Sequence, residues 1–327
     1  MTFKAFKITQ ADGKIAGAVM DTTLDQLTPG DVVIKAAYSS VNYKDALAAT
    51  GVARILSKLP LIGGIDVAGT VASSSDTRFK EGDPVLVTGY DLGVGNDGGY
   101  SAYVRVPGDW VVNVPSSLTL FEAMALGTAG FTAGLSVIRL EQHGLRAGSA
   151  PVVVTGATGG VGSIAVAILA GLGFDVTAVT GKDSEHEYLK SLGAKTVMPR
   201  PAVDKSPKPL EKAMWAGAVD PVGGDILAWL IRTMNYGASI ANSGLTGGVE
   251  VHTTVVPFIL RGVNLLGIDS VMCPMPLRLE VWRRLASDMK PKMLKSIARE
   301  IPLTDLPGAF RTLASGSARG RFVVNVA

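Results

Sequence analysis

The chain has 327 residues, 47% of them hydrophobic and 18% charged, which predicts about two folded domains and excludes a disordered protein. Its net charge of +3 gives no basis for a nucleic-acid surface, and its single cysteine, Cys273, excludes an intrachain disulfide framework and favours a reducing, cytoplasmic compartment. One cysteine and three scattered histidines, His143, His186 and His252, match no metal-ligand spacing, so no metal site is expected.

The first third of the chain has the pattern of short β-strands. Alternating or apolar runs cover residues 3–9, 31–39, 65–72, 84–87, 100–106 and 111–114, with glycine and aspartate between them. Short strands at this spacing are typical of a small barrel or sandwich. A helix is expected over 120–140, interrupted near 127–130 by the sequence GTAG.

From residue 151 onward, predicted strands alternate with predicted helices. The strands cover 152–155, 176–180, 196–198, 218–222, 238–242 and 264–268, and the helices cover 160–172, 185–191, 225–235 and 256–261. This alternation predicts a doubly wound parallel sheet. A helix over 307–315 and a strand over 321–326 end the chain, and this last strand is expected to rejoin the first domain.

The uncharged stretch 147–174 is long enough to cross a membrane. It contains Pro151 and a glycine-rich turn, whose backbone groups would be left without partners in lipid. A buried strand, a tight loop and a buried helix are therefore expected instead, and no membrane partner is predicted.

The segment 152–163 (VVVTGATGGVGS) carries the clearest chemical signal in the sequence. It is an apolar strand, a glycine turn and the start of a helix, the arrangement that places free N–H groups and the helix dipole against a pyrophosphate. Gly162 would let the helix pack closely on the strand, whereas Ala157 replaces the first glycine of the usual pattern. The alternative is a glycine turn without a ligand.

The end of the second predicted strand indicates which dinucleotide is bound. An NAD site usually places Asp or Glu there, but this chain has Thr180, Gly181 and Lys182, with the acid one step later at Asp183. A hydroxyl, an open backbone and a cation suit a 2′-phosphate, and Arg200 is a second candidate for that phosphate or for the adenine face. NADPH is therefore predicted, unless these cations are ordinary surface charges.

A polar cluster, Asn42, Tyr43, Lys44 and Asp45, follows the strand 31–39. Its amide, phenol, ammonium and carboxylate could orient a carbonyl substrate or anchor the nicotinamide ribose. The alternative is that these residues only cap a helix.

Taken together, these segments resemble the zinc-free branch of the medium-chain dehydrogenase/reductase superfamily, with its quinone-oxidoreductase-like members. The landmarks are residues 40–45 (SVNYKD), 64–71 (GIDVAGTV) and 127–133 (GTAGFTA). A narrower resemblance, to the NADPH-dependent acryloyl-CoA reductases, rests on 186–194 (HEYLKSLGA), 234–237 (MNYG), 257–261 (PFILR) and 267–272 (GIDSVM).

The resemblance implies an α/β plus β fold. A GroES-like β-barrel domain would cover 1–120, completed by 300–327, and a Rossmann NADPH-binding domain would cover 121–299. It also implies a set of cofactor contacts, which are Tyr43, Gly159, Gly160, Val161, Gly162, Ser163, Thr180, Gly181, Lys182, Arg200, Leu245, Ile259, Ser270 and Asn325.

The implied reaction is reduction of the C=C bond of acryloyl-CoA to propionyl-CoA, with hydride from NADPH added at the β-carbon. The thioester oxyanion then needs a hydrogen-bond donor and the α-carbon needs a proton. Asn42, Tyr43 and Lys44 are candidate donors, and Asp45 is expected to orient them.

Two other functions stay open on the sequence. The same chemistry could act on quinones or other small enones, or the chain could bind NADPH as a redox sensor without turnover, which the intact 42–45 cluster argues against. A homodimer is implied by the resemblance, with the apolar edge strand 264–268 pairing with its symmetric copy.

Overall fold

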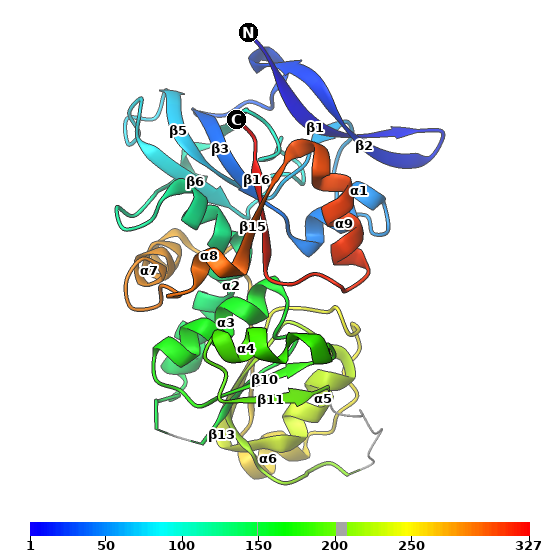
Figure 1. The fold of residues 1–327 in the computed structure, drawn as a ribbon, viewed down its shortest axis with the longest axis vertical. Coiled ribbons are helices and arrows are strands. Elements are labelled where there is room, and N and C mark those ends of the chain that lie inside the picture. Colours follow the sequence, from blue (N-terminus) through cyan, green and yellow to red (C-terminus); the bar gives the residue numbers. More distant parts are fainter. Residues whose placement is uncertain (149, 201–207) are drawn as a thin grey trace. The chain divides into compact units, whose positions relative to one another are not determined.

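The computed structural model describes residues 1–148, 150–200 and 208–327, which form two compact units (Figure 1). Unit 1 comprises Met1–Thr128, Val271–Pro274 and Leu294–Ala327, and unit 2 comprises Ala129–Ser270 and Met275–Met293. The division thus falls at Thr128 rather than at residue 120, and the chain returns to unit 1 for its last segment at Leu294 rather than at residue 300. Thr128 stays with unit 1 because its N–H and hydroxyl both donate to the buried carboxylate of Asp66.

Unit 1 is built from two β-sheets. A three-stranded sheet has the order β2-β1-β4, and a seven-stranded sheet has the order β15-β16-β3-β5-β6-β8, with β7 paired to β3. The last strand, β16, pairs antiparallel with β3, so the chain end rejoins the first domain. The elements are β1 (Thr2–Ala11), β2 (Lys14–Thr23), β3 (Val32–Ser40), α1 (Tyr43–Thr50), β4 (Leu61–Ile62), β5 (Asp66–Ser74), β6 (Pro84–Thr88), β7 (Tyr103–Val106), β8 (Val112–Asn113), α8 (Leu294–Ile297), β15 (Ala298–Pro302), α9 (Leu306–Ala314) and β16 (Arg321–Asn325).

The core of unit 1 joins segments from both ends of the chain. The ring of Phe6, from β1, meets those of Tyr100 and Phe310 edge-on, with centroids 6.3 and 5.7 Å away. Phe310 lies on α9, which packs against α1. These aromatic contacts bury apolar surface between the first strand and the last helix, so the C-terminal segment is part of the core of unit 1.

Unit 2 is a six-stranded parallel sheet with the order β11-β10-β9-β12-β13-β14, which confirms the doubly wound fold. Strands β9 and β10 are buried along their whole length, as is typical of a parallel sheet that is covered on both faces. The elements are β9 (Val152–Val154), α3 (Gly160–Gly171), β10 (Val176–Thr180), α4 (His186–Ser191), β11 (Thr196–Pro199), β12 (Trp215–Asp220), α5 (Gly224–Thr233), β13 (Met234–Asn242), α6 (Val256–Arg261), β14 (Asn264–Gly267) and α7 (Met275–Leu285).

Helix α2 (Leu120–Gln142) starts in unit 1 and ends in unit 2. It is interrupted, as expected, at Gly127, where φ is 50° and ψ is −155°. By length and composition α2 could cross a membrane, but 83% of its most apolar 18-residue stretch is buried inside the protein, as in a core helix. Residues 150–174 of the uncharged stretch contain β9, the glycine turn and α3.

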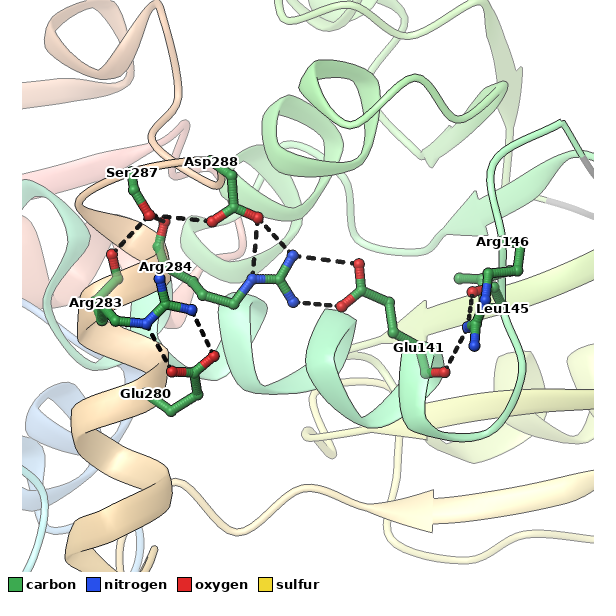
Figure 2. A network of polar contacts seen from close by, with 8 residues as sticks. All are labelled: Glu141, Leu145, Arg146, Glu280, Arg283, Arg284, Ser287 and Asp288. Atoms are coloured by element: carbon green, nitrogen blue, oxygen red, sulfur yellow. Dashed lines mark hydrogen bonds and ion pairs between the residues drawn. The ribbon is translucent and has the colours of Figure 1, made fainter.

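A network of charged side chains ties α7 to the second half of α2 (Figure 2). Arg284 of α7 is ion-paired with Glu141 of α2 and, at 2.6 Å, with Asp288. Six residues earlier on α7, the guanidinium of buried Arg278 lies 4.9 Å from the ring centroid of Phe131. These contacts explain why α7 belongs to unit 2 although residues before and after it belong to unit 1.

Candidate functional site

The turn after β9 has the geometry of a pyrophosphate-binding loop. Gly156 has a φ of 52°, and the first bond of α3 runs from Ser163 N to Gly159 O at 2.9 Å. A Cβ on Gly162 would lie 2.4 Å from the carbonyl oxygen of Gly156, so only glycine lets the helix start this close to the loop. The N–H groups of the first helical turn come before that first bond in the chain and are not used by the helix itself. They are therefore the donors that a phosphate needs. This turn contains all five residues predicted for it, Gly159, Gly160, Val161, Gly162 and Ser163.

The predicted 2′-phosphate residues come together at the end of β10. Arg200 N donates to Thr180 O at 2.7 Å, and Lys182 N donates to the Thr180 hydroxyl at 3.1 Å. The guanidinium of Arg200 lies 3.6 Å from the position that a Cβ on Gly181 would take. Partial burial lowers the pKa of the Lys182 ammonium, and Glu185 opposes that shift. The Arg200 guanidinium therefore lies beside the open backbone at Gly181, Lys182 follows Gly181 directly in the chain, and no acid ends the strand.

The remaining predicted cofactor residues lie in different places. Leu245 lines a hollow of about 360 Å³ at the carboxyl ends of β12, β13 and β14. Ile259 is 71% exposed on α6 and does not line this hollow. The Ser270 carbonyl accepts a hydrogen bond from Arg278 at 3.3 Å. Asn325 lies in unit 1, on β16, where its amide donates to Glu300.

In unit 1, two members of the polar cluster predicted from the sequence, Asn42 and Asp45, are part of a buried network. The Asn42 amide donates to Asp66 Oδ2 at 2.8 Å and accepts from Arg321 Nη1 at 3.1 Å. Arg321 also donates to the Ser40 hydroxyl at 2.6 Å, and Ser40 in turn donates to Asp66. Both polar ends of the Asn42 side chain are therefore engaged inside unit 1.

Asp45 is buried and caps its own helix. Its Oδ2 accepts from Asn42 N at 2.8 Å and its Oδ1 accepts from Ile65 N at 3.0 Å. Burial, together with the neighbouring carboxylate of Asp66, raises the pKa of Asp45 to about 7. The capping interpretation thus describes Asp45 and Asn42, whereas Tyr43, the first residue of α1, is 37% exposed.

The raised pKa of Asp45 predicts a pH-dependent stability. Between its ordinary pKa of 3.8 and about 7, the folded protein holds a proton at Asp45 that the unfolded chain releases. The stability contributed by this site is therefore greatest below pH 3.8 and is lost as the pH rises to about 7, by roughly 4 kcal/mol in all. Urea unfolding across this range should show the stability of the wild type falling relative to that of Asp45→Asn as the pH rises, because the amide does not titrate, and a constant difference would contradict the assignment.

The sequence analysis gave no role to several residues of this network, and the two charged ones among them are Asp66 and Arg321. Asp66 lies within the landmark 64–71 but was given no role, and it is fully buried. Gly127 packs directly against this network, because a Cβ there would lie 2.6 Å from Asp66 Oδ2 and 2.8 Å from Arg321 Nη2. The network joins residues from the beginning, middle and end of unit 1.

Two family models match the chain, one on each unit. The alcohol dehydrogenase GroES-like domain matches residues 28–116, and the zinc-binding dehydrogenase model matches residues 160–287. The side chains of this protein do not fit the zinc ion that the name of the second model implies. The chain has one cysteine, and among residues 1–148, 150–200 and 208–327 no group of three or more His, Cys, Asp or Glu side chains could hold a metal ion.

Relatives match over nearly the whole length. Acrylyl-CoA reductase AcuI of Ruegeria pomeroyi is 49% identical, over 97% of this chain and 96% of its own. The structure of E. coli K-12 YhdH with bound NADPH is 47% identical, with a TM-score of 0.96 and coverage of 99% and 100%. That of Bacillus subtilis YhfP with NAD bound is 52% identical, with a TM-score of 0.97 and coverage of 99% of both chains. The chain therefore belongs to the quinone-oxidoreductase-like branch of the medium-chain dehydrogenase/reductase superfamily.

Proposed function

We propose that this protein is a cytoplasmic, NADPH-dependent reductase that converts acryloyl-CoA to propionyl-CoA. Membership of the superfamily makes it an oxidoreductase. The observation that carries the choice of substrate is the 49% identity to acrylyl-CoA reductase AcuI over 97% of the chain. The choice of NADPH is supported by Lys182 and Arg200 beside Gly181, where an NAD site would usually have an acid.

The residues of unit 2 would hold the dinucleotide. Backbone N–H groups of the turn Gly159–Ser163 would bind the pyrophosphate, and Lys182 and Arg200, with Thr180 and Gly181, would bind the 2′-phosphate. NADPH, when bound, supplies the hydride. Leu245, Ile259, Ser270 and Asn325 are proposed as further cofactor contacts, on its nicotinamide and pyrophosphate side.

The residues of unit 1 would bind the thioester and stabilise the developing enolate. Asn42 and Asp45 are proposed as positioning residues, because their polar atoms bond to Asp66, Arg321 and the backbone. Tyr43 follows Asn42 directly and is exposed, so it is the group proposed to contact the nicotinamide or the substrate. The proton for the α-carbon comes either from the Tyr43 hydroxyl or from water.

Tyr43 variants separate these two roles. If the ring only packs the nicotinamide, Tyr43→Phe should be nearly silent in steady-state kinetics, whereas Tyr43→Ala should raise the NADPH KM. This is the result we expect, since Phe keeps the ring. A fall in kcat of roughly 10²-fold in Tyr43→Phe would instead assign the hydroxyl to proton transfer or enolate stabilisation. Unchanged kinetics in both variants would remove Tyr43 from the site.

The proposed reaction is tested by following NADPH oxidation with three acceptors in parallel. Acryloyl-CoA should be reduced with the highest kcat/KM, ahead of crotonyl-CoA and benzoquinone. A preference for benzoquinone would assign the protein to quinone or small-enone reduction. NADPH binding without turnover on any acceptor would favour the sensor function.

We also propose that the protein is a homodimer paired through β14. This strand is the edge of the sheet of unit 2, and Leu265 within it is 44% exposed. An apolar edge strand is an aggregation hazard unless it is covered, and pairing with its symmetric copy would cover it. Light scattering should return about twice the 33.9 kDa chain mass, and Leu265→Lys should shift the mass toward the monomer. A wild-type mass near 34 kDa at micromolar concentration would exclude the dimer.

A further inference from the structure

Three loops meet at the carboxyl edge of the sheet in unit 2, after the neighbouring strands β9, β12 and β13. A Cβ on Gly156, in the loop after β9, would lie 2.9 Å from Val222 Cγ2, in the loop after β12. A Cβ on Gly244, in the loop after β13, would lie 2.1 Å from Pro221 O. The loop after β12 is therefore packed directly against the other two, with no space for a side chain between them.

A single carboxylate, that of Asp220, lies among these three loops. Asp220 is the last residue of β12 and is fully buried. Its Oδ1 accepts from the Thr155 hydroxyl at 2.5 Å and from Val222 N at 3.1 Å. Its Oδ2 accepts from Gly223 N at 3.1 Å and from Asn242 Nδ2 at 2.9 Å. Each oxygen thus accepts two bonds, and the four donors come from all three strand ends.

These donors adjoin the residues that are proposed to bind the dinucleotide. Thr155 immediately precedes Gly156, which opens the pyrophosphate turn. Asn242 and Gly223 both line the hollow that Leu245 also lines. Buried charge-assisted bonds of this kind hold a loop in one conformation. An ordered loop loses less entropy when it binds a ligand.

We propose that Asp220 is a positioning residue for the dinucleotide: it orders the pyrophosphate turn through Thr155 and the walls of the hollow through Gly223 and Asn242. The inference rests on the proposed function, because it takes these loops as the cofactor site. Both carboxylate oxygens of Asp220 accept bonds from these protein donors, so its effect on the cofactor is transmitted by the residues that it holds.

The Thr155 hydroxyl allows a test that keeps the buried charge intact. Thr155→Val keeps the shape of the side chain but removes the donor to Asp220, and Thr155→Ser restores the donor while losing a methyl group. Thr233→Val is the matched control. Thr233 is also buried, and its hydroxyl donates to Trp229 O at 3.0 Å, but it lies just before β13, at the opposite end of that strand from Asn242.

NADPH dissociation constants from cofactor fluorescence, NADPH KM and kcat, and melting temperatures without cofactor should be measured for all four proteins. We expect Thr155→Val to raise the NADPH Kd and KM about tenfold, or about 1.4 kcal/mol, with kcat nearly unchanged. Thr155→Ser should restore most of this affinity, and Thr233→Val should bind NADPH like the wild type while losing similar thermal stability to Thr155→Val.

Each other outcome has a defined meaning. If Thr155→Val binds NADPH like the wild type, or if Thr155→Ser binds NADPH as weakly as Thr155→Val, the positioning role is overturned while the proposed function stands. If Thr233→Val weakens NADPH binding equally, the effect is one of general stability and the proposal also fails. Absence of NADPH binding by the wild type would overturn the proposed function and this inference together.

Discussion

Replacing Arg321 with methionine should destabilise unit 1 by about 3–5 kcal/mol, because it leaves buried carboxylates without their counter-charge. Arg321 is 3% exposed and lies 3.7 Å from Asp66 Oδ2. It also donates to Val41 O at 2.9 Å and to the side chains of Asn42 and Ser40. Methionine fills much of the same volume but makes none of these bonds.

Urea unfolding of the wild type and Arg321→Met measures this loss. Arg299→Met is the matched control, since Arg299 lies exposed on the neighbouring strand β15, opposite Phe322 of β16. It should change stability by no more than about 0.5 kcal/mol. Equal unfolding midpoints for Arg321→Met and the wild type would show that Asp66 and Asp45 do not depend on the guanidinium.

Removing both cations at the end of β10 should abolish the preference for NADPH over NADH. A charge-assisted contact to the 2′-phosphate contributes roughly 1.5–3 kcal/mol, so Lys182→Ala and Arg200→Ala should each raise the NADPH KM about ten- to a hundredfold. NADH carries no 2′-phosphate, so its KM should change little. The double variant should show the larger effect, because it removes both cations that are proposed to bind the phosphate.

The measurement is the ratio of NADPH and NADH KM values for each variant. Lys190→Ala is a suitable control, because Lys190 is an exposed cation on α4 that is ion-paired with Glu187 at 2.8 Å. Equal increases of the NADPH KM and the NADH KM in Lys182→Ala would contradict a phosphate contact. If only Arg200→Ala raises the NADPH KM and the NADH KM equally, Arg200 is assigned to the adenine face.

Some elements escaped the sequence analysis for identifiable physical reasons. Strand β2 alternates only between exposed and half-buried residues along most of its length, so its apolar pattern is weak. Helix α7 buries Arg278 on its inner face, which breaks the apolar period expected of a core-facing helix. Strand β15 is only five residues long and mostly exposed, and its pairing partner β16 lies beyond α9.

By itself, the sequence determined the parallel sheet, the glycine turn at 156–162, the break in α2 and the absence of an acid at the end of β10. Each of these is a local pattern: strand and helix periods, glycine at positions that no other residue can occupy, and residue type at a strand end. Only the tertiary structure decided which side chains meet. Arg321 is hydrogen-bonded to Asn42, 279 positions away in the sequence, and Asp220 is hydrogen-bonded to Thr155, 65 positions away. No local sequence pattern encodes such pairs. Burial then decided that Asn42 and Asp45 bond within unit 1 while Tyr43 beside them stays exposed.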